Sequence, residues 1–364
     1  MPLRFHWRLP LAGEEPGATA PLPAPSPQAI TAASALPDVP AHLEFCRLAE
    51  AHGIDSLLMA CGFYLPDPVP VVAALSRSTE TIRFLLAYRP GLLSPTAFVQ
   101  QVNTLSALSG GRLALNVVMG HSAAEQATYG DFLSHDERYE RAGEFLEVCR
   151  AFWRPMGEGN GEVDFTGTYF RIEQGRLKTP FVAPDRQAPE IYLGGGSPPA
   201  LELAARHGDC WLRLGDTPGN VREQVRWVRE RGVEAGMRLS IVARPTREEA
   251  VAAAYGLLEG GDREWIQRTF VQGSDSAGVR SAIALAAEES HWPEPYLWTG
   301  AVASRGASAV CLVGSPDEIA GAILDYAAIG VTQFIFSGWP NSAALSYFGA
   351  EILPRVRARE KEVD

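Results

Sequence analysis

The glycine-rich segment GGGSPP, residues 194–199, has the composition of an anion-binding turn. It follows an apolar run and precedes a helical pattern, so it would join a strand to the start of a helix. Glycines let backbone N–H groups approach an anion, and the positive end of the helix dipole attracts negative charge. Gly195 and Gly196 would supply N–H groups, while Ser197 could donate its hydroxyl or cap the helix. The motif alone fits a phosphate site and a plain capped turn about equally.

Two further polar residues share a helical face in the segment SHDERYERAGEF, residues 134–145. His135 and Tyr139 are four positions apart, and residues at that spacing are neighbours on a helix surface. Spacing alone favours a histidine near the helix cap and a tyrosine in the core. Arg138 is expected to point elsewhere and to form a structural ion pair.

Three arginines stand next to expected strands or insertions: Arg89, Arg238 and Arg305. The planar guanidinium binds phosphate or sulfonate well, because it forms paired, charge-assisted hydrogen bonds. The three residues are therefore candidates for holding an anion. A surface ion pair is nevertheless the commoner fate of a single arginine.

Two other kinds of catalytic chemistry have weak support. Residues 120–124, GHSAA, follow an apolar run and nearly match the G-x-S-x-G turn of serine hydrolases. However, Ala124 replaces the second glycine and no clear apolar helix follows, so Ser122 is a weak candidate for a nucleophile. The seven histidines show neither H-x-H nor H-E-x-x-H spacing, and we therefore expect no metal site.

Eight short apolar segments alternate with helical patterns. This alternation predicts a closed (β/α)8 TIM barrel with insertions, formed by one domain over residues 1–364. Ligands bind at the carboxyl ends of the strands in parallel barrels, and Asn116 and Gly120 flank that end of the fourth segment. The expected strands cover residues 3–9, 55–60, 83–88, 112–118, 190–193, 210–214, 238–243 and 332–336.

Three stretches interrupt this alternation. Residues 12–40 are rich in Pro, Ala, Gly and Ser and would form a long loop. Residues 155–189 contain an alternating pattern around Gly167, which predicts a small hairpin insertion. Residues 260–304 are too long for a plain crossover, so we expect a lid-like insertion over the mouth of the barrel. Helices should begin near Pro198, Pro218, Arg247, Pro316 and Asn341.

The composition argues against several classes of function. The net charge of −11 and the pI near 5.2 disfavour a nucleic-acid partner, which requires basic patches. No run of roughly 18 apolar residues could cross a membrane, and the first residues lack a secretory signal pattern. The five cysteines are scattered, which is typical of reduced, mostly buried thiols in a cytoplasmic protein.

The segments LSGGRLALNVVMG and SHDERYERAGEF, in this order, resemble the bacterial-luciferase-like, flavin-dependent monooxygenases, and most closely their alkanesulfonate monooxygenase branch. The resemblance extends from RFHWRLP near the start to SGWP near the end. It implies a (β/α)8 barrel, reduced FMN and O2 as co-substrates, a homodimer or homotetramer, and a separate NAD(P)H-dependent flavin reductase as partner. No G-x-G-x-x-G segment for binding NAD(P)H appears, which agrees with an external reductase.

The resemblance places the flavin at the mouth of the barrel, with its phosphate near the glycine-rich turn. Gly120 would leave room for the flat isoalloxazine ring, and Trp7 and Trp339 would form apolar walls. The residues implied to contact the cofactor are Cys61, Arg89, Asn116, Gly120, His135, Tyr139, Gly195, Gly196 and Ser197. The residues implied to act on the substrate are Arg238, Arg305 and Trp339.

Four departures from the resembled enzymes concern the substrate side. Ser240 stands where they carry the histidine of Arg-x-His, and Trp339 replaces the tyrosine of SGYP. Leu65 aligns with their cysteine after the second strand, although Cys61 lies nearby, and Ala12 replaces a histidine. We therefore expect an intact flavin frame and an altered substrate. The leading expectation is a small polar or anionic compound of the organosulfur, alkanesulfonate-like class.

Two alternatives stay open. Related barrels use the deazaflavin F420 for hydride transfer, and the sequence does not separate this cofactor from FMN. The missing histidine and tyrosine also fit a catalytically inactive flavin-binding protein. Substrate-dependent oxygenation in the presence of reduced FMN and air would discriminate between these readings and a monooxygenase.

Overall fold

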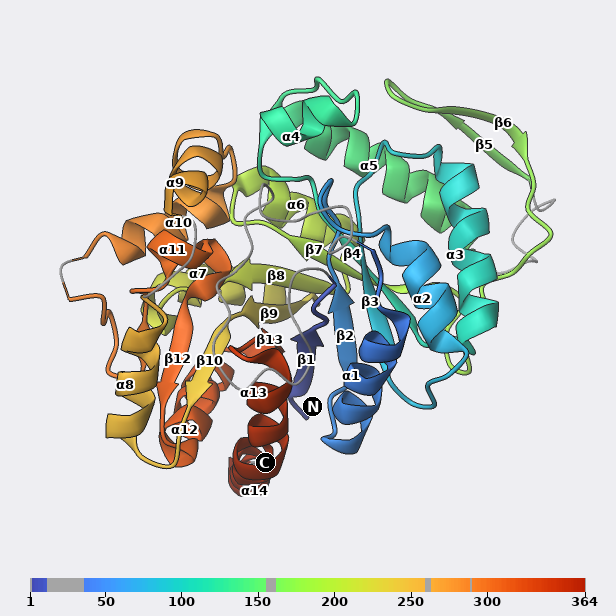
Figure 1. Ribbon diagram of the computed structural model, residues 1–364. Helices are drawn as coiled ribbons and strands as arrows, with labels where there is room; N and C mark the ends of the chain where they lie inside the picture. Colours follow the sequence, from blue (N-terminus) through green and yellow to red (C-terminus); the bar gives the residue numbers. More distant parts are fainter. Residues whose placement is uncertain (1, 12–35, 155–161, 259–262, 289, 364) are drawn as a thin grey trace.

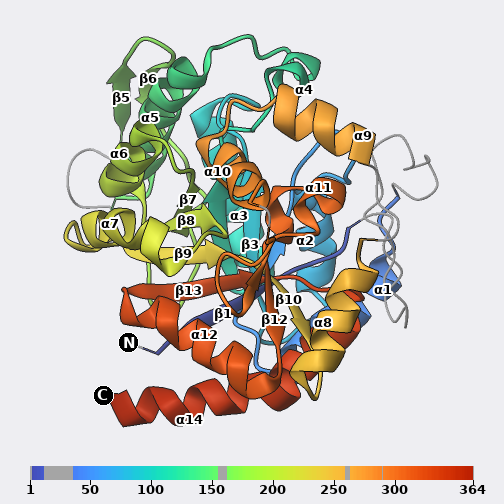
Figure 2. The same cartoon turned by 90° about the vertical axis from the view of Figure 1, so that its left-hand side faces the viewer.

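Eight parallel strands close into a barrel in the computed structural model, which describes residues 2–11, 36–154, 162–258, 263–288 and 290–363. The strand order is β1-β13-β9-β8-β7-β4-β3-β2, and helices cover the outside (Figures 1 and 2). The expected (β/α)8 fold is confirmed. The strands are β1 (Arg4–Arg8), β2 (Ser56–Met59), β3 (Arg83–Tyr88), β4 (Leu113–Val117), β7 (Glu190–Gly194), β8 (Cys210–Leu214), β9 (Glu234–Arg238) and β13 (Val331–Phe336).

Each barrel strand is followed by at least one helix, most of which begin at capped positions. Helices begin at Pro198, Pro218, Arg247, Pro316 and Asn341, as the sequence predicts. Gly110 ends α3 with a φ of +62°, in the left-handed conformation that glycine adopts without strain. The main outer helices are α1 (Val39–Ala51), α2 (Pro68–Ser76), α3 (Pro95–Ser109), α5 (His135–Phe152), α6 (Pro198–His207), α7 (Pro218–Arg229), α12 (Pro316–Ala328) and α13 (Asn341–Tyr347).

The interior of the barrel is filled with side chains. Seven of them form one buried cluster: Leu58, Leu85, Ala114, Tyr192, Cys210, Leu212 and Ile335. The amino-terminal end is closed by ion pairs, in which Glu190 lies 2.6 Å from Arg4 and 3.2 Å from Arg83. Because these described side chains fill the interior, we expect a ligand to bind among the loops at the carboxyl ends of the strands.

The seventh barrel strand differs from its expected position. It is β9, Glu234–Arg238, whereas residues 240–243 form β10 in a separate sheet of order β10-β12-β11. The chain leaves the barrel after Arg238, because Leu239 N still donates to Ile335 O but Ser240 N donates to Val310 O. The prediction of residues 238–243 was wrong because Gly236 weakens the strand pattern, while the apolar run after Arg238 belongs to the second sheet.

Two additions to the barrel agree with the expected insertions in position. The hairpin consists of β5 (Val163–Thr166) and β6 (Arg171–Gly175). The connection from β9 to β13 is longer than the predicted 260–304 segment. The elements of this connection are β10 (Ser240–Ala243), α8 (Arg247–Gly256), α9 (Arg263–Ile266), η1 (Gln267–Gln272), α10 (Ala277–Ala286), β11 (Leu297–Trp298), α11 (Val302–Arg305), η2 (Ala307–Ala309), β12 (Cys311–Gly314) and α12.

Parts of the expected loops fall outside the described residues, namely 12–35, 155–161, 259–262 and 289. Two helical segments complete the described fold at its end, the π-helix η3 (Phe348–Ile352) and α14 (Leu353–Val363). None of the helices in the described part of the chain is long and apolar enough to cross a bilayer. All five cysteines are free and four are buried, as the sequence predicts.

His6 inside the barrel should make folding sensitive to acid. Its Nδ1 lies 2.7 Å from Ser56 Oγ and its Nε2 lies 2.9 Å from Gln333 Oε1, and burial lowers its pKa from 6.5 to about 4. The folded state therefore favours neutral imidazole. This contribution is complete above about pH 6.5 and is lost as the pH falls toward 4, by about 1.4 kcal/mol per pH unit.

We expect the difference in unfolding free energy between the natural protein and His6→Gln to shrink by roughly 3 kcal/mol from pH 7 to pH 4. Urea unfolding at several pH values measures it. His207, whose pKa burial also lowers to about 4, is present in both proteins and cancels in the difference. A difference that does not change with pH would show that His6 is not the titrating group.

Candidate active site at the carboxyl ends of the strands

The glycine-rich turn after β7 and the start of α5 come together at the mouth of the barrel. A Cβ placed on Gly195 would lie 2.7 Å from the Tyr139 hydroxyl, so this hydroxyl packs directly against the glycine backbone. Gly195 also has a φ of +138°, which disfavours any other residue. The ring of His135 lies 4.9 Å from that of Tyr139 between centroids. The fold thus joins two segments that are about 60 positions apart in the sequence.

Ser197 lies at the centre of this arrangement, which we call the cradle (His135, Tyr139, Gly195, Gly196 and Ser197). It is the N-cap residue of α6, but its side chain makes no capping hydrogen bond. Its Oγ is buried and faces the Tyr139 hydroxyl without a hydrogen bond of regular geometry. Burial raises the pKa of Tyr139, so the phenol stays protonated at neutral pH and can donate. The cradle therefore presents two hydroxyl donors.

The first turn of α6 contributes less to anion binding than the sequence suggests. Pro198 and Pro199 occupy its first two positions, and proline has no N–H group. Gly195 N already donates to Leu212 O at 3.1 Å. The helix dipole still favours an anion, but most of the donors must come from side chains.

Arg213 is a candidate site residue that sequence reasoning missed. It lies on β8, is 7% exposed, and its guanidinium carbon lies 3.1 Å from the position of a Cβ on Gly196. Its Nη2 pairs with Asp216 at 3.3 Å and its Nε donates to Gln224, whereas its Nη1 has no partner. The only signal in the sequence is an arginine within the otherwise apolar strand CWLRL. A buried cation with a free donor beside the cradle fits a phosphate group.

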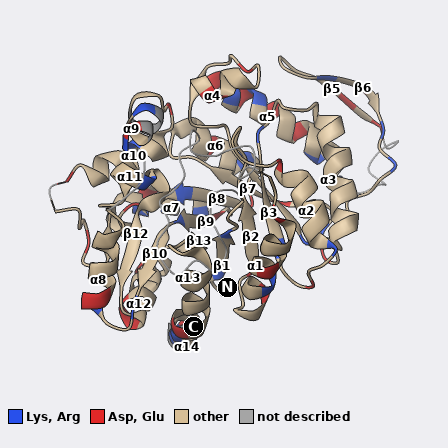
Figure 3. Cartoon of the chain, in the orientation of Figure 1, with Lys and Arg blue, Asp and Glu red and all other residues tan. Residues whose placement is uncertain are grey.

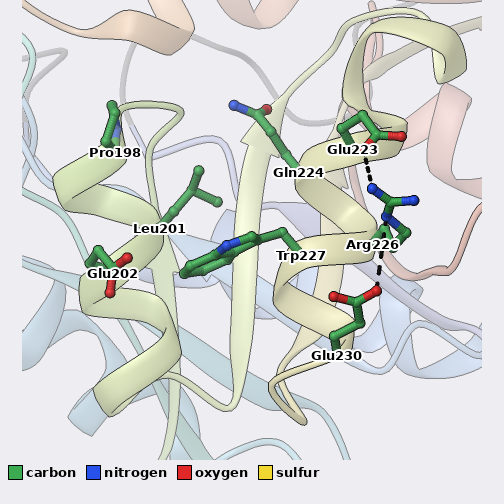
Figure 4. Close-up of a pocket in the computed structure, with 8 residues that line it drawn as sticks. All are labelled: Pro198, Leu201, Glu202, Glu223, Gln224, Arg226, Trp227 and Glu230. Carbon is green, nitrogen blue, oxygen red and sulfur yellow. Dashed lines mark hydrogen bonds and ion pairs between the residues drawn. The ribbon is translucent and has the colours of Figure 1, made fainter.

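A groove on the outer surface reaches the back of the cradle (Figure 4). It lies between α6 and α7 and has a volume of about 350 Å³. Gln224 at its inner end donates to Gly196 O and accepts from Arg213, so it supports the turn from behind. Farther out, Arg226 pairs with Glu223 and lies 3.9 Å from Glu230. The groove is a surface feature and holds none of the predicted site residues.

Arg138 forms the structural ion pair that the sequence predicts. It is 1% exposed and pairs with Asp275, which lies between η1 and α10. Asp275 N also donates to His121 O at 3.1 Å, and Ser274 forms a β-bridge with Ser122. The middle of the β9–β13 connection is therefore docked on the loop after β4 and on α5, beside the cradle.

Asn116 and Gly120 lie at the carboxyl end of β4 and contact different neighbours. Asn116 sits between Ala87 of β3 and Tyr192 of β7, and its buried Oδ1 has no partner. It is thus available to a ligand above the filled interior. Gly120 has a φ of +76°, and the Gln126 side chain occupies the space of its missing Cβ while donating to Met119 O. The packing of Gln126 thus requires glycine at this position, and the contact of Gly120 with a flavin ring stays a prediction.

Arg89, also predicted at the site, is buried just after β3. Its Nη2 lies 2.8 Å from Oε1 of Glu125, a residue of the short helix α4 (Ala123–Thr128). Cys61 lies close enough for the guanidinium to act on its thiol, whose pKa is nonetheless raised by burial. Ser122 caps α4 in an extended conformation, accepting from Glu125 N, so it lacks the strained turn of a hydrolase nucleophile.

Arg238 and Arg305 lie around the same buried thiol on the other side of the mouth. Both act electrostatically on Cys311, although burial still raises the pKa of that thiol to about 12. Arg238 donates to Leu239 O and to Ser337 Oγ. Arg305 donates to Leu257 O at 3.3 Å, and its guanidinium lies 5.3 Å from the ring centre of Trp339. The fold therefore brings these three predicted residues into one region.

Ser240 and Trp7 differ in their position relative to this region. Ser240, which stands in place of the expected histidine, lies 3.0 Å from Ser337 Oγ and donates to Ser308 O. Hydroxyl groups thus replace an imidazole here. Trp7, which the sequence predicts as a wall of the site, points outward instead. It is fully buried against Phe336 and Phe348, and its Nε1 donates to Asn341.

The structure is thus a closed parallel (β/α)8 barrel with buried arginines and a glycine-rich turn at its mouth. A family model described as luciferase-like monooxygenase matches residues 19–333. The chain therefore belongs to the luciferase-like monooxygenase family. Together with the monooxygenases among the solved structures of the same fold, this membership supports a flavin-dependent monooxygenase.

Solved structures show the same fold. Riboflavin lyase RcaE, solved with modified FMN and riboflavin, has a TM-score of 0.78 at 23% identity, over 99% of this chain and 92% of that one. EDTA monooxygenase EmoA from Chelativorans sp. BNC1 has a TM-score of 0.76 at 20% identity, over 99% and 94%. An F420-dependent secondary alcohol dehydrogenase with an F420–acetone adduct has a TM-score of 0.67 at 18% identity, over 98% and 100%.

The cradle should contribute to FMN binding through the phosphate alone. We expect Ser197→Ala to weaken the binding of reduced FMN by about 1–2 kcal/mol, or roughly 5- to 30-fold, because one hydrogen bond to a charged group is lost. Riboflavin lacks the phosphate, so its affinity should not change. Anaerobic titration of both reduced flavins measures the effect, with Ser315→Ala, at the cap of α12, as the control. Equal losses of affinity for the two flavins would show that Ser197 does not bind the FMN phosphate.

Proposed function

We propose that the protein is an FMNH2- and O2-dependent monooxygenase of a two-component system, supplied with reduced FMN by a separate NAD(P)H-dependent flavin reductase. The observation that carries the proposal is the cradle, with the buried Ser197 hydroxyl and the free Nη1 of Arg213 beside it. Unsatisfied buried donors are unfavourable in a folded protein unless a ligand or water accepts from them. A phosphate monoester has enough acceptor oxygens to bind both of these donors.

The roles of the chain are binding, orientation and exclusion of water. When bound, reduced FMN would supply the electrons that activate O2. Tyr139, Ser197 and Arg213 would hold its phosphate, and Asn116 Oδ1 would accept a hydrogen bond at the base of the site. The segment around Asp275 would act as a lid, since its ion pair with Arg138 already fixes it beside the cradle.

The substrate would be a small polar or anionic compound, with an alkanesulfonate-like organosulfur compound as the leading candidate. Arg238 and Arg305 are both buried and both act on the Cys311 thiol, so their guanidinium groups lie in one region. A guanidinium binds a sulfonate well, because its planar donors form paired, charge-assisted hydrogen bonds. An anionic head group would bind in this region, with Trp339 beside Arg305 as an apolar wall.

We also expect the protein to be cytoplasmic. Five free cysteines, four of them buried, fit a reducing cytoplasm. A homodimer or homotetramer remains our expectation. The fold of an F420-dependent dehydrogenase is also similar to this one, so a deazaflavin is the alternative cofactor that a test must include.

Replacing Arg305 should separate substrate chemistry from flavin binding. We expect Arg305→Ala to lower substrate-dependent oxygenation of a sulfonate at least about 100-fold, because a buried charge-assisted pair of roughly 3 kcal/mol is lost. The affinity for reduced FMN should stay within about twofold, the scale of a remote substitution. Sulfite release in the presence of a flavin reductase, NADH and FMN measures activity, and Arg305→Lys should retain a part of it.

The same assay contains the outcomes that would contradict the proposal. If the natural protein oxidises an alcohol with F420 and shows no oxygenation with reduced FMN, it is a deazaflavin oxidoreductase. If Arg305→Ala loses the flavin but keeps coupled turnover when flavin is in excess, Arg305 belongs to the cofactor site. Binding of reduced FMN without turnover of any substrate would indicate a catalytically inactive protein.

A further inference from the structure

The ion pair between Arg89 and Glu125 leaves several polar atoms without partners. Each side chain is 7% exposed, and Nη2 lies 2.8 Å from Oε1. Three other atoms of the pair, Arg89 Nε, Arg89 Nη1 and Glu125 Oε2, are buried without a hydrogen bond. Buried charged groups normally use all of their hydrogen-bonding capacity, because an unsatisfied one loses its hydration without compensation. A pair with both free donors and a free acceptor is therefore incomplete.

Among the described residues, the neighbours of the pair complete it only in part. The ring of Tyr129 lies 5.4 Å from the Arg89 guanidinium, and the Cys61 thiol interacts with Arg89 but is a weak hydrogen-bond acceptor. His121 Nδ1 lies 3.9 Å from Glu125 Oε2, beyond hydrogen-bonding distance, and burial lowers the pKa of His121, so its imidazole is mostly neutral at pH 7. A Cβ on Gly62 would lie 3.5 Å from Glu125 Oε1, so the pair is in contact with the loop after β2.

The charge of the pair determines what could complete it. Arg89 and Glu125 compensate each other, so the pair as a unit is neutral. An anion would gain from the guanidinium but would be repelled by the free oxygen of Glu125. A cation would be repelled by the guanidinium for the same reason. A neutral group that accepts and donates at adjacent atoms can satisfy both sides at once.

We propose that Arg89 and Glu125 form a recognition subsite for an amide-type group, in which a carbonyl accepts from Arg89 and the adjacent N–H donates to Glu125 Oε2. This proposal rests on the proposed function and refines its ligand. Two molecules in that reaction could present the group. One is a substrate with a carboxamide or lactam, and the other is reduced FMN, whose pyrimidine ring carries an N–H between two carbonyls.

The first arm of the test uses three sulfonates of equal length that end in a carboxamide, a methyl ketone or a carboxylate. Their binding to the protein loaded with reduced FMN is measured anaerobically by calorimetry, so no turnover is needed. We expect the carboxamide to bind about tenfold more tightly than either of the others, the scale of one satisfied hydrogen bond to a charged group. The second arm compares reduced FMN with its N3-methyl derivative, which lacks the donor.

The variant Glu125→Met supplies the decisive result. Methionine has a similar length but no acceptor oxygen, and it leaves the Arg89 charge uncompensated. The preference should therefore reverse, so that the carboxylate binds more tightly than the carboxamide by about tenfold, whereas Glu125→Gln should keep part of the original preference. A purely structural role would weaken all probes together. Glu190→Gln, which alters a similarly buried glutamate in its ion pair with the more exposed Arg4 at the opposite end of the barrel, should change no preference.

Each outcome separates the two sources or contradicts the proposal. Discrimination among the sulfonates assigns the subsite to the substrate, and a loss on N3-methylation that disappears in Glu125→Met assigns it to the flavin. Absence of discrimination in both arms, or tighter binding of the carboxylate by the natural protein, would overturn the inference. These binding measurements do not require oxygenation, so they test the subsite separately from the proposed monooxygenase activity.

Discussion

Burial of arginine at the mouth of the barrel is the constraint on which the site depends. Five guanidinium groups around the strand ends are each at most 8% exposed, and a buried charge is unfavourable unless it is paired and hydrogen-bonded. Blue ribbon segments near β8, β9 and α11 show part of this concentration in an otherwise acidic protein (Figure 3). The five residues are Arg89, Arg138, Arg213, Arg238 and Arg305.

The ways in which these charges are compensated divide the mouth into distinct regions. Arg89, Arg138 and Arg213 each pair with a carboxylate, so each forms a nearly neutral unit with particular free donors. Arg238 donates to Leu239 O and Ser337 Oγ, and Arg305 donates to Leu257 O and lies beside the ring of Trp339. The two groups of arginines also lie on opposite sides of the mouth. This separation agrees with the proposal that a phosphate, a neutral polar group and an anionic head group bind at separate places.

The sequence specifies the barrel more fully than the site. Strands such as β4 could be predicted because all five residues are buried, which requires a continuous apolar run. Strand β9 could not be predicted, because Gly236 leaves only four side chains in its hydrophobic pattern. The ion pair of Arg138 could be expected, but its partner Asp275 is 137 positions away and only the fold identifies it. Arg213 was also missed because only the fold shows that it lies next to Gly196, in the glycine-rich turn after the neighbouring strand β7.

Because Ser240 replaces a histidine, the region around Arg238 lacks an imidazole at this position. Serine hydroxyls and arginine do not exchange protons near neutral pH, so the region of Arg238 and Arg305 can orient an anion but cannot act there as an acid or base. His121 lies in the other half of the mouth, beside Glu125, and burial lowers its pKa. The imidazole of this region therefore stands beside Glu125 after β4, and not beside Arg238 as it would at position 240.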